Sequence, residues 1–319
     1  MNNLLKTIPV LAIFMGSLAA QAVPLVYQKT TLSGGKVSFV KESTMTAEEF
    51  SKTNYSMKPD QAILQNNYRL TMTERMALSA KDFDSMTQEE IDQIYIRLSS
   101  GPIVPGKYKG SVLSKGNLAQ KAKDLIYGSY KGIPKFGSKL CGDTDLLECV
   151  AELAWKGKRI YEPDPETGET MLKNAISKKV AFAIKAALTP WYDKFNFTNW
   201  LATTTGVFYG ETKFMLFPAH VYCGQSLLDH RRESILIDYA WGSDFRSIKG
   251  IDELAGREYL AIRDEIRMVR PGLYLGRAYT NKIFLLNFVL YNPEAEAEGN
   301  KLTSGWPQDA CFDSLKATR

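Results

Sequence analysis

The sequence predicts an α+β fold whose main part is an antiparallel β-barrel preceded by an N-terminal helical segment. After Gly101 the chain is a succession of β-rich runs separated by turn signals, whereas helical spacing is concentrated before it. The run Ile283–Tyr291 is apolar at odd and even positions, with Asn287 as the interruption. An open sheet with one wet face would alternate. We therefore expect this strand to be covered on both sides, as in a barrel wall packed outside by a helix.

The strands expected from these runs are separated by glycine, proline and asparagine turns. Pro271-Gly272 and Thr280-Asn281 each join two of them. A further run, Val180–Leu188, has helical spacing. The expected strands are Gly106–Gly110, Met171–Ile176, Phe214–Phe217, Ala219–Tyr222, Ser234–Tyr239, Ile262–Val269, Leu273–Tyr279 and Ile283–Tyr291.

The composition is that of a globular protein. The 319 residues are 45% hydrophobic and 24% charged, which excludes disordered and collagen-like chains. The net charge of +5 is too small to argue for a nucleic-acid partner. Because the chain has two histidines, a multi-histidine metal site is not expected. We expect no cofactor, no metal and no nucleic acid.

Residues 1–22 have the pattern of a signal peptide. Lys6 precedes an apolar run from Ile8 to Ala20, and Ala20-Gln21-Ala22 fits the small-x-small cleavage pattern. The apolar run is too short to cross about 30 Å of hydrocarbon comfortably. The mature chain is therefore expected to begin at Val23, to contain no transmembrane helix and to be exported, either to the periplasm or as a secreted protein.

Four cysteines agree with export: Cys141, Cys149, Cys223 and Cys311. An even number in an oxidising compartment predicts two disulfides, for which three pairings exist. A Cys141–Cys149 bond is favoured because closing a short loop costs little entropy. Cys223 and Cys311 would then tie the C-terminal tail to a central strand. No C-x-x-C motif is present.

The region before the barrel, residues 23–100, contains a hairpin signal and two helix starts. Gly34-Gly35 suits a tight reversal between two short strands. The segments beginning at Thr46 and Thr87 each carry a glutamate three residues on, which predicts a capping box. Residues 46–98 are either a separate helical domain or a lid on the barrel of residues 101–319; we favour one compact unit.

Four short blocks give the chain a resemblance to a known family. They are Pro-Gly-Lys-Tyr-Lys-Gly at 105–110, Trp-Lys-Gly-Lys-Arg at 155–159, Leu-Ile-Asp-Tyr at 236–239 and Val-Arg-Pro-Gly-Leu-Tyr-Leu-Gly at 269–276. In this order they resemble the GXWXG-type small β-barrel proteins, over about residues 101–291. Tyr108 stands where that motif has tryptophan, and Ile160 where it has phenylalanine. The region Tyr222–Ser226 is similar to a group of exported bacterial proteins of unknown function. The resemblance implies a lipocalin- or calycin-like barrel and supplies no catalytic residue.

The function favoured by this fold is non-enzymatic binding of an apolar or amphipathic, lipid-like small molecule in the barrel lumen. Arg267 or Arg277 is the expected head-group anchor. Tyr108 is expected to plug one end, and Arg277 to stack on the ring of Tyr108 or Trp155, as lipocalins often do. The candidate ligand-binding residues are Tyr108, Trp155, Tyr222, Tyr239, Arg267, Arg277, Asn287 and Phe288.

A first alternative is a secreted hydrolase acting on envelope lipid or glycan. No P-loop, dinucleotide fingerprint or H-E-x-x-H motif occurs. The residues that would serve such an enzyme are the two histidines and nearby carboxylates, since a histidine is a suitable general base at neutral pH. They are His220, Asp229, His230 and Glu265.

A second alternative is an envelope or surface interaction protein. Residues 107–139 hold eight lysines and one acid, Asp124. Such a segment suits an anionic polymer or an anionic lipid. The lysines are Lys107, Lys109, Lys115, Lys121, Lys123, Lys131, Lys135 and Lys139.

Overall fold

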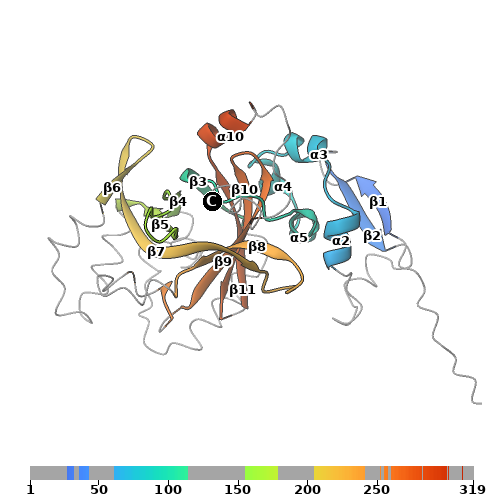
Figure 1. Cartoon of the computed structure of the whole chain (residues 1–319). Coiled ribbons are helices and arrows are strands. Elements are labelled where there is room, and N and C mark those ends of the chain that lie inside the picture. Colours follow the sequence, from blue (N-terminus) through green and yellow to red (C-terminus); the bar gives the residue numbers. More distant parts are fainter. Residues whose placement is uncertain are drawn as a thin grey trace, which may run out of the picture.

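The computed structural model, drawn in Figure 1, describes residues 27–31, 36–42, 61–113, 155–178, 205–240, 252, 255–257, 260–281, 283–299, 301 and 311. Several expected features lie outside these residues: the signal peptide at 1–22, the helices starting at Thr46 and Val180, and the pair Cys141 and Cys149.

Eight strands form a closed antiparallel β-barrel, which confirms the predicted barrel. The order is β5-β4-β3-β11-β10-β9-β8-β7, and β5 pairs with β7 to close it. The strands are β3 (Gly106–Leu113), β4 (Trp155–Ile160), β5 (Thr170–Ile176), β7 (Glu211–Gln225), β8 (Glu233–Asp238), β9 (Ile262–Arg270), β10 (Leu273–Thr280) and β11 (Ile283–Tyr291). A further strand, β6 (Thr205–Phe208), pairs with the start of β7. A separate hairpin pairs β1 (Tyr27–Thr31) with β2 (Ser38–Glu42).

One expectation about the strands is corrected. The runs Phe214–Phe217 and Ala219–Tyr222 belong to a single strand, β7, which passes through Pro218. Because proline has no N–H to donate, it is tolerated in a sheet mainly at edges and bulges. Here Phe217 has a φ of 53°, and its N–H bonds the carboxylate of Asp252 at 2.6 Å. The irregularity lets β7 bend without ending.

Side-chain alternation divides the barrel wall into two apolar faces. One face points into the lumen and carries residues such as Met268, Tyr274 and Phe288. The other, with Val269 and Val289 among its residues, packs against the helices outside the barrel. The strand Ile283–Tyr291 contributes to both clusters. Its predicted coverage on two sides is therefore confirmed for Asn287–Leu290, whereas Ile283 at its start is exposed.

Four short helices cover the outside of β9, β10 and β11, at the right of Figure 1. They are α2 (Gln61–Asn67), α3 (Met72–Ala77), α4 (Asp82–Ser85) and α5 (Gln88–Arg97). A fifth, α10 (Pro293–Gly299), follows β11. The predicted capping box at Thr87 is present, and Thr71 with Glu74 forms another that the sequence analysis did not single out.

Arginine side chains fasten these helices to the barrel. The last carbonyls of a helix have no partner within it, and their partial negative charge attracts cations. Arg267 donates to the carbonyl of Leu98 at 2.6 Å, and Arg232 donates to that of Ile96 at 2.5 Å, both at the C-terminal end of α5. Arg270 donates to the carbonyl of Leu78, where α3 ends. Cations of β9 and of the loop before β8 are thus complementary to helix ends.

The predicted disulfide between Cys223 and Cys311 is present, with a Cα–Cα distance of 5.6 Å. It holds residue 311 against the C-terminal end of β7. The backbone N–H of Cys311 also bonds the hydroxyl of Ser100 and the carboxylate of Glu233. Cys223, Glu233 and Cys311 lie close enough to hold a metal ion, but the two sulfur atoms are bonded to each other.

Candidate functional site

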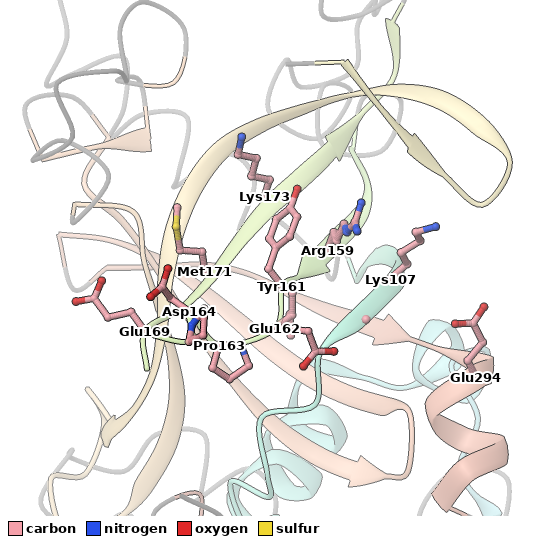
Figure 2. A pocket seen from close by; sticks show the side chains of 13 residues that line it. Lys107, Arg159, Tyr161, Glu162, Pro163, Asp164, Glu169, Met171, Lys173 and Glu294 are labelled. Carbon is pink, nitrogen blue, oxygen red and sulfur yellow. The ribbon is translucent and has the colours of Figure 1, made fainter. Parts of the chain in front are cut away.

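A hollow of about 730 Å³ lies on the outer wall of the barrel (Figure 2). Its floor is formed by β3, β4 and β5, one side by the loop that joins β4 to β5, and another by α10. Small-molecule sites in proteins commonly have volumes of about 300–1,000 Å³. The hollow therefore has the size of a ligand site.

Three cations form a row across its floor. Lys107 of β3 is the direct cross-strand partner of Arg159 of β4, and Arg159 is the partner of Lys173 of β5. Like charges placed directly opposite one another destabilise a sheet. Among the described residues, none of the three side chains forms an ion pair or a side-chain hydrogen bond that would offset this repulsion. We call these three residues the cation row.

The sequence places the cation row outside the barrel because its neighbours are buried inside. Tyr108, Ile160 and Leu172 belong to the lumenal core, so the residues beside them point outward. Lys173 also lies at a bulge. Phe217 and Pro218 of β7 oppose it, since Leu172 pairs with Ala219 and Asn174 with Leu216. Bulges of this kind redirect side chains and are frequent beside functional sites.

Four carboxylates also line the hollow. In Figure 2, Glu162, Asp164 and Glu169 lie along the β4–β5 loop, with Asp164 and Glu169 away from Lys107, whereas Glu294 of α10 lies beside Lys107. The loop has a defined shape. Asp164 Oδ1 accepts hydrogen bonds from the N–H groups of Glu166 and Thr167, each at 2.9 Å.

These loop contacts also set the charge of Asp164. The N–H groups of Thr167 and Glu166 lower the pKa of Asp164, so this carboxyl is ionised at neutral pH. Gly168 has a φ of 72°, a left-handed conformation that suits glycine. An aspartate before Pro165 and a glycine at the end of the reversal are typical turn residues. The turn therefore positions the acidic side chains.

Tyr161 lines the hollow, and Tyr209 lies close to Lys107 on its floor. The guanidinium of Arg159 lies 4.8 Å from the centre of the Tyr161 ring. Tyr209, at the tip of the β6–β7 hairpin, has a φ of 48° and bonds the carbonyl of Lys107 through its hydroxyl. Lys109 lies over the same ring. Burial and the charge of Glu294 raise the pKa of Tyr209 to about 12. The hairpin tip is thus fixed beside the hollow by a strained residue with several partners.

Inside the barrel, a buried ion pair occupies the position where a lumenal ligand was expected. Lys158 Nζ lies 2.9 Å from the carboxylate of Asp264, 2.9 Å from Asn174 Oδ1 and 2.5 Å from the Tyr239 hydroxyl. All three ammonium protons therefore have acceptors. The Trp155 indole N–H also bonds Asn174 Oδ1, at 3.0 Å.

Aromatic rings surround this ion pair. The Lys158 ammonium lies 5.2–5.4 Å from the ring centres of Trp155, Tyr239 and Phe288, a range in which cations are attracted to ring faces. The Trp155 indole takes the space beside Gly110, where an added Cβ would lie 2.4 Å from the ring. The lumenal polar groups described here are therefore bonded mainly to one another.

The lumenal network is expected to make the free energy of unfolding depend on pH in the alkaline range. Burial lowers the pKa of Lys158, but Asp264 and Tyr239 raise it by more, so the net shift is upward. Burial raises the pKa of Tyr239 from 10.0 to about 12. A group whose pKa is raised by folding stabilises the folded state below its unfolded pKa, and this stabilisation is lost as the pH rises.

We expect the free energy of unfolding to fall between about pH 10 and pH 12. Tyr239→Phe removes one of the titrating groups, so its stability should fall less steeply over the same window. Urea unfolding at a series of pH values measures both slopes. Equal slopes for the two proteins would show that Tyr239 titrates alike in the folded and unfolded chains.

The other candidate ligand residues are divided between the lumen and the outside. Tyr108 is a lumenal residue; its hydroxyl bonds the carbonyl of Val104, and its ring meets that of Tyr274 edge to face at 5.6 Å. It packs at the start of β3. Tyr222 is on the outer face, because Val221 and Cys223 on either side belong to the lumenal core.

The expected anchors are corrected: Arg267, Arg277 and Asn287 do not line the lumen. Arg277 stacks on Tyr95 of α5 at 4.1 Å, not on Trp155 or Tyr108. Asn287 donates to the side chain of Gln88 on α5 at 2.8 Å. Arg267 bonds the end of α5. These side chains alternate with the lumenal ones and lie beneath the helices.

The four residues of the hydrolase alternative are not gathered into one site. His220 pairs across strands with Asp238 and Met171. His230 lies in the loop beyond Gln225, which is roughly 16 Å along β7 from His220 at about 3.3 Å per residue.

The two hydrolase carboxylates are each engaged elsewhere. Asp229 pairs with Arg231 at 2.8 Å. Glu265 is fully buried and accepts from the hydroxyl of Ser226 and the N–H of Leu227. Burial lowers the pKa of His220, so its imidazole is neutral at neutral pH.

The lysine-rich segment is described in part. Lys107 belongs to the cation row, and Lys109 lies on Tyr209. The other six lysines, Lys115, Lys121, Lys123, Lys131, Lys135 and Lys139, lie outside the described residues. Sequence reasoning missed Arg159 and Lys173 as partners of Lys107. The signal that could have identified them is the alternation of basic residues with apolar ones in β3, β4 and β5.

Comparison with known proteins found no matching family model, curated protein or solved structure. Within the described part of the chain, no helix combines the length and apolar character that crossing a bilayer requires. The function is therefore argued from the site itself.

Proposed function

We propose that this protein is a non-enzymatic binding protein for an amphipathic small molecule that carries an anionic group, and that the ligand binds in the outer hollow. The single observation that carries the proposal is the cation row, three positive side chains in direct cross-strand register on the floor of a cavity. An arrangement that destabilises the free protein is offset when an anion binds to it. Arginine and lysine together suit a phosphate or a carboxylate.

The surroundings support an amphipathic ligand. Ile160, Tyr161 and Met171 give the hollow apolar surface beside its charges. The resemblance to lipocalin-like barrels and the expected export agree with a small-molecule carrier, and the Cys223–Cys311 bond agrees with an oxidising compartment. The lumen remains the site expected from the sequence, but its polar groups are already paired with one another.

Glycerol phosphate is a suitable probe of the cation row. We expect it to bind in isothermal titration at low salt and to weaken as salt is added, because a partly exposed charge contact is screened. Arg159→Gln and Lys173→Gln should each weaken binding about tenfold or more, since a hydrogen bond to a charged group contributes about 1.5–3 kcal/mol.

The matched control is Lys178→Gln, which changes an exposed lysine just beyond β5 that does not line the hollow. It should bind the probe like the unchanged protein. Thermal melts of all three variants separate lost binding from lost folding. Equal affinity of the Arg159, Lys173 and Lys178 variants, or no binding by the unchanged protein, would contradict the proposed function.

A further inference from the structure

We infer that the ligand of the hollow is dipolar: it carries a phosphate for the cation row and, at its other end, a primary ammonium for the acidic side. This inference rests on the proposed function and names the chemistry of its ligand. It is carried by the presence of two oppositely charged sides in one cavity that do not neutralise each other.

The acidic side consists of groups that the fold leaves available. Glu162 and Glu169 are exposed on the β4–β5 loop. Among the described residues, neither of these two carboxylates forms an ion pair or accepts a hydrogen bond. Asp164 uses Oδ1 to hold the turn by accepting from the N–H groups of Glu166 and Thr167.

The cation row and these carboxylates line the same hollow, yet no salt bridge joins them in the described part of the chain. Lysine and arginine side chains are long and pair readily with a carboxylate within reach. Here the turn at Asp164 holds one side, and the cross-strand register holds the other. In Figure 2, Asp164 and Glu169 of the β4–β5 loop lie on the side of the hollow away from Lys107. A molecule with both charges can contact both sides simultaneously.

Three cations in register favour phosphate at the positive end, because a phosphate presents several oxygens to neighbouring donors. An ammonium with three donors suits the other side, where several carboxylate oxygens are available. The shared chemistry is that of a phosphoethanolamine group. This group exists both as a free small molecule and as a phospholipid head group, and the apolar surface of Met171 and Tyr161 is compatible with a lipid.

The test compares O-phosphoethanolamine with glycerol phosphate, which has no ammonium, by isothermal titration of the purified protein. We expect phosphoethanolamine to bind about tenfold more tightly, the gain of one ionic contact. Glu162→Gln and Glu169→Gln should reduce this preference severalfold while leaving the affinity for glycerol phosphate unchanged or improved. Lys173→Gln should weaken both ligands.

Glu166→Gln is the matched control, since Glu166 lies on the same loop but does not line the hollow. It should keep the full preference. Equal affinity for the two probes, or a preference that survives both acidic-side changes, would overturn the dipolar ligand while leaving the anion site standing. Failure of both probes to bind would instead overturn the proposed function.

Vesicles separate the two sources of the ligand. Preferential binding to phosphatidylethanolamine over phosphatidylglycerol vesicles, lost in the Lys173→Gln protein, supports a lipid head group. Binding of soluble phosphoethanolamine without binding to these vesicles supports a free small molecule of the same chemistry. A preference for phosphatidylglycerol vesicles would contradict the dipolar ligand.

Discussion

Replacing Lys158 by alanine is expected to lower the free energy of unfolding by about 3–5 kcal/mol, because removing one partner of a buried ion pair leaves the other charge uncompensated. The Asp264 carboxylate is buried and lies 2.9 Å from Lys158 Nζ. The substitution also removes the donor to Asn174 and Tyr239. Urea unfolding of the variant and the unchanged protein measures the difference.

Two further variants make this expectation specific. Lys158→Met combined with Asp264→Leu removes both charges and fills similar space, so it should recover most of the lost stability. Lys178→Ala, at an exposed lysine, should change stability by no more than about 0.5 kcal/mol. A Lys158→Ala protein as stable as the Lys178 control would mean that the ion pair is not what organises the lumen.

Arg267→Ala is expected to have the second large effect, a loss of about 3 kcal/mol or more. The Arg267 guanidinium is fully buried and donates to the carbonyls of Leu98 and Glu233 and to the side chain of Gln65. Without it, the buried carbonyl of Leu98 loses its charged donor and the end of α5 loses one of its two cations.

Arg267→Lys should not restore stability, because a single ammonium cannot reproduce the fork of the guanidinium. Arg231→Ala is the control. Arg231 belongs to the neighbouring β7–β8 loop, but its side chain is 61% exposed and pairs with Asp229. Denaturant unfolding followed by far-UV circular dichroism reports the loss. Equal midpoints for the Arg267 and Arg231 variants would contradict the account of how the helices are fastened.

The barrel could be predicted from the sequence because its strands alternate with turns and because one strand is apolar on both faces. Because both faces of this strand are apolar, the sequence does not show which face points into the lumen. Periodicity separates Asn287 and Val289 from Phe288 and Leu290, but it does not say which set is inside. The helices settle this, since α5 lies on the face that carries Asn287. Arg267 and Arg277 were therefore expected in the lumen and lie outside it.

The lumenal ion pair was not predictable from local sequence. Lys158 lies in the block Trp-Lys-Gly-Lys-Arg, which has the composition of an exposed basic strand. A bulge between Trp155 and Gly157 and pairing with β5 bring Lys158 to Asn174, while Asp264 arrives from β9. These partners are separated by 16 and 106 residues in the chain. Only the closed sheet brings them together.

Of the three residues in the cation row, the sequence analysis identified Lys107 alone as a candidate. Lysines are frequent along residues 107–139, but the cation row has one residue in each of three neighbouring strands. Its other members, Arg159 and Lys173, are set by register and by the bulge opposite Lys173. A cross-strand site of this kind becomes visible once the pairing of β3, β4 and β5 is known.

Nuclear magnetic resonance mapping with O-phosphoethanolamine tests the location of the binding site most directly. The Trp155 indole N–H, bonded to Asn174, reports on the lumen, and the amides around Arg159, Lys173 and Asp164 report on the hollow. We expect saturable shifts in the second set, with the indole signal unmoved. Shifts of the Trp155 indole with an unchanged β4–β5 loop would place the ligand in the lumen and contradict the account.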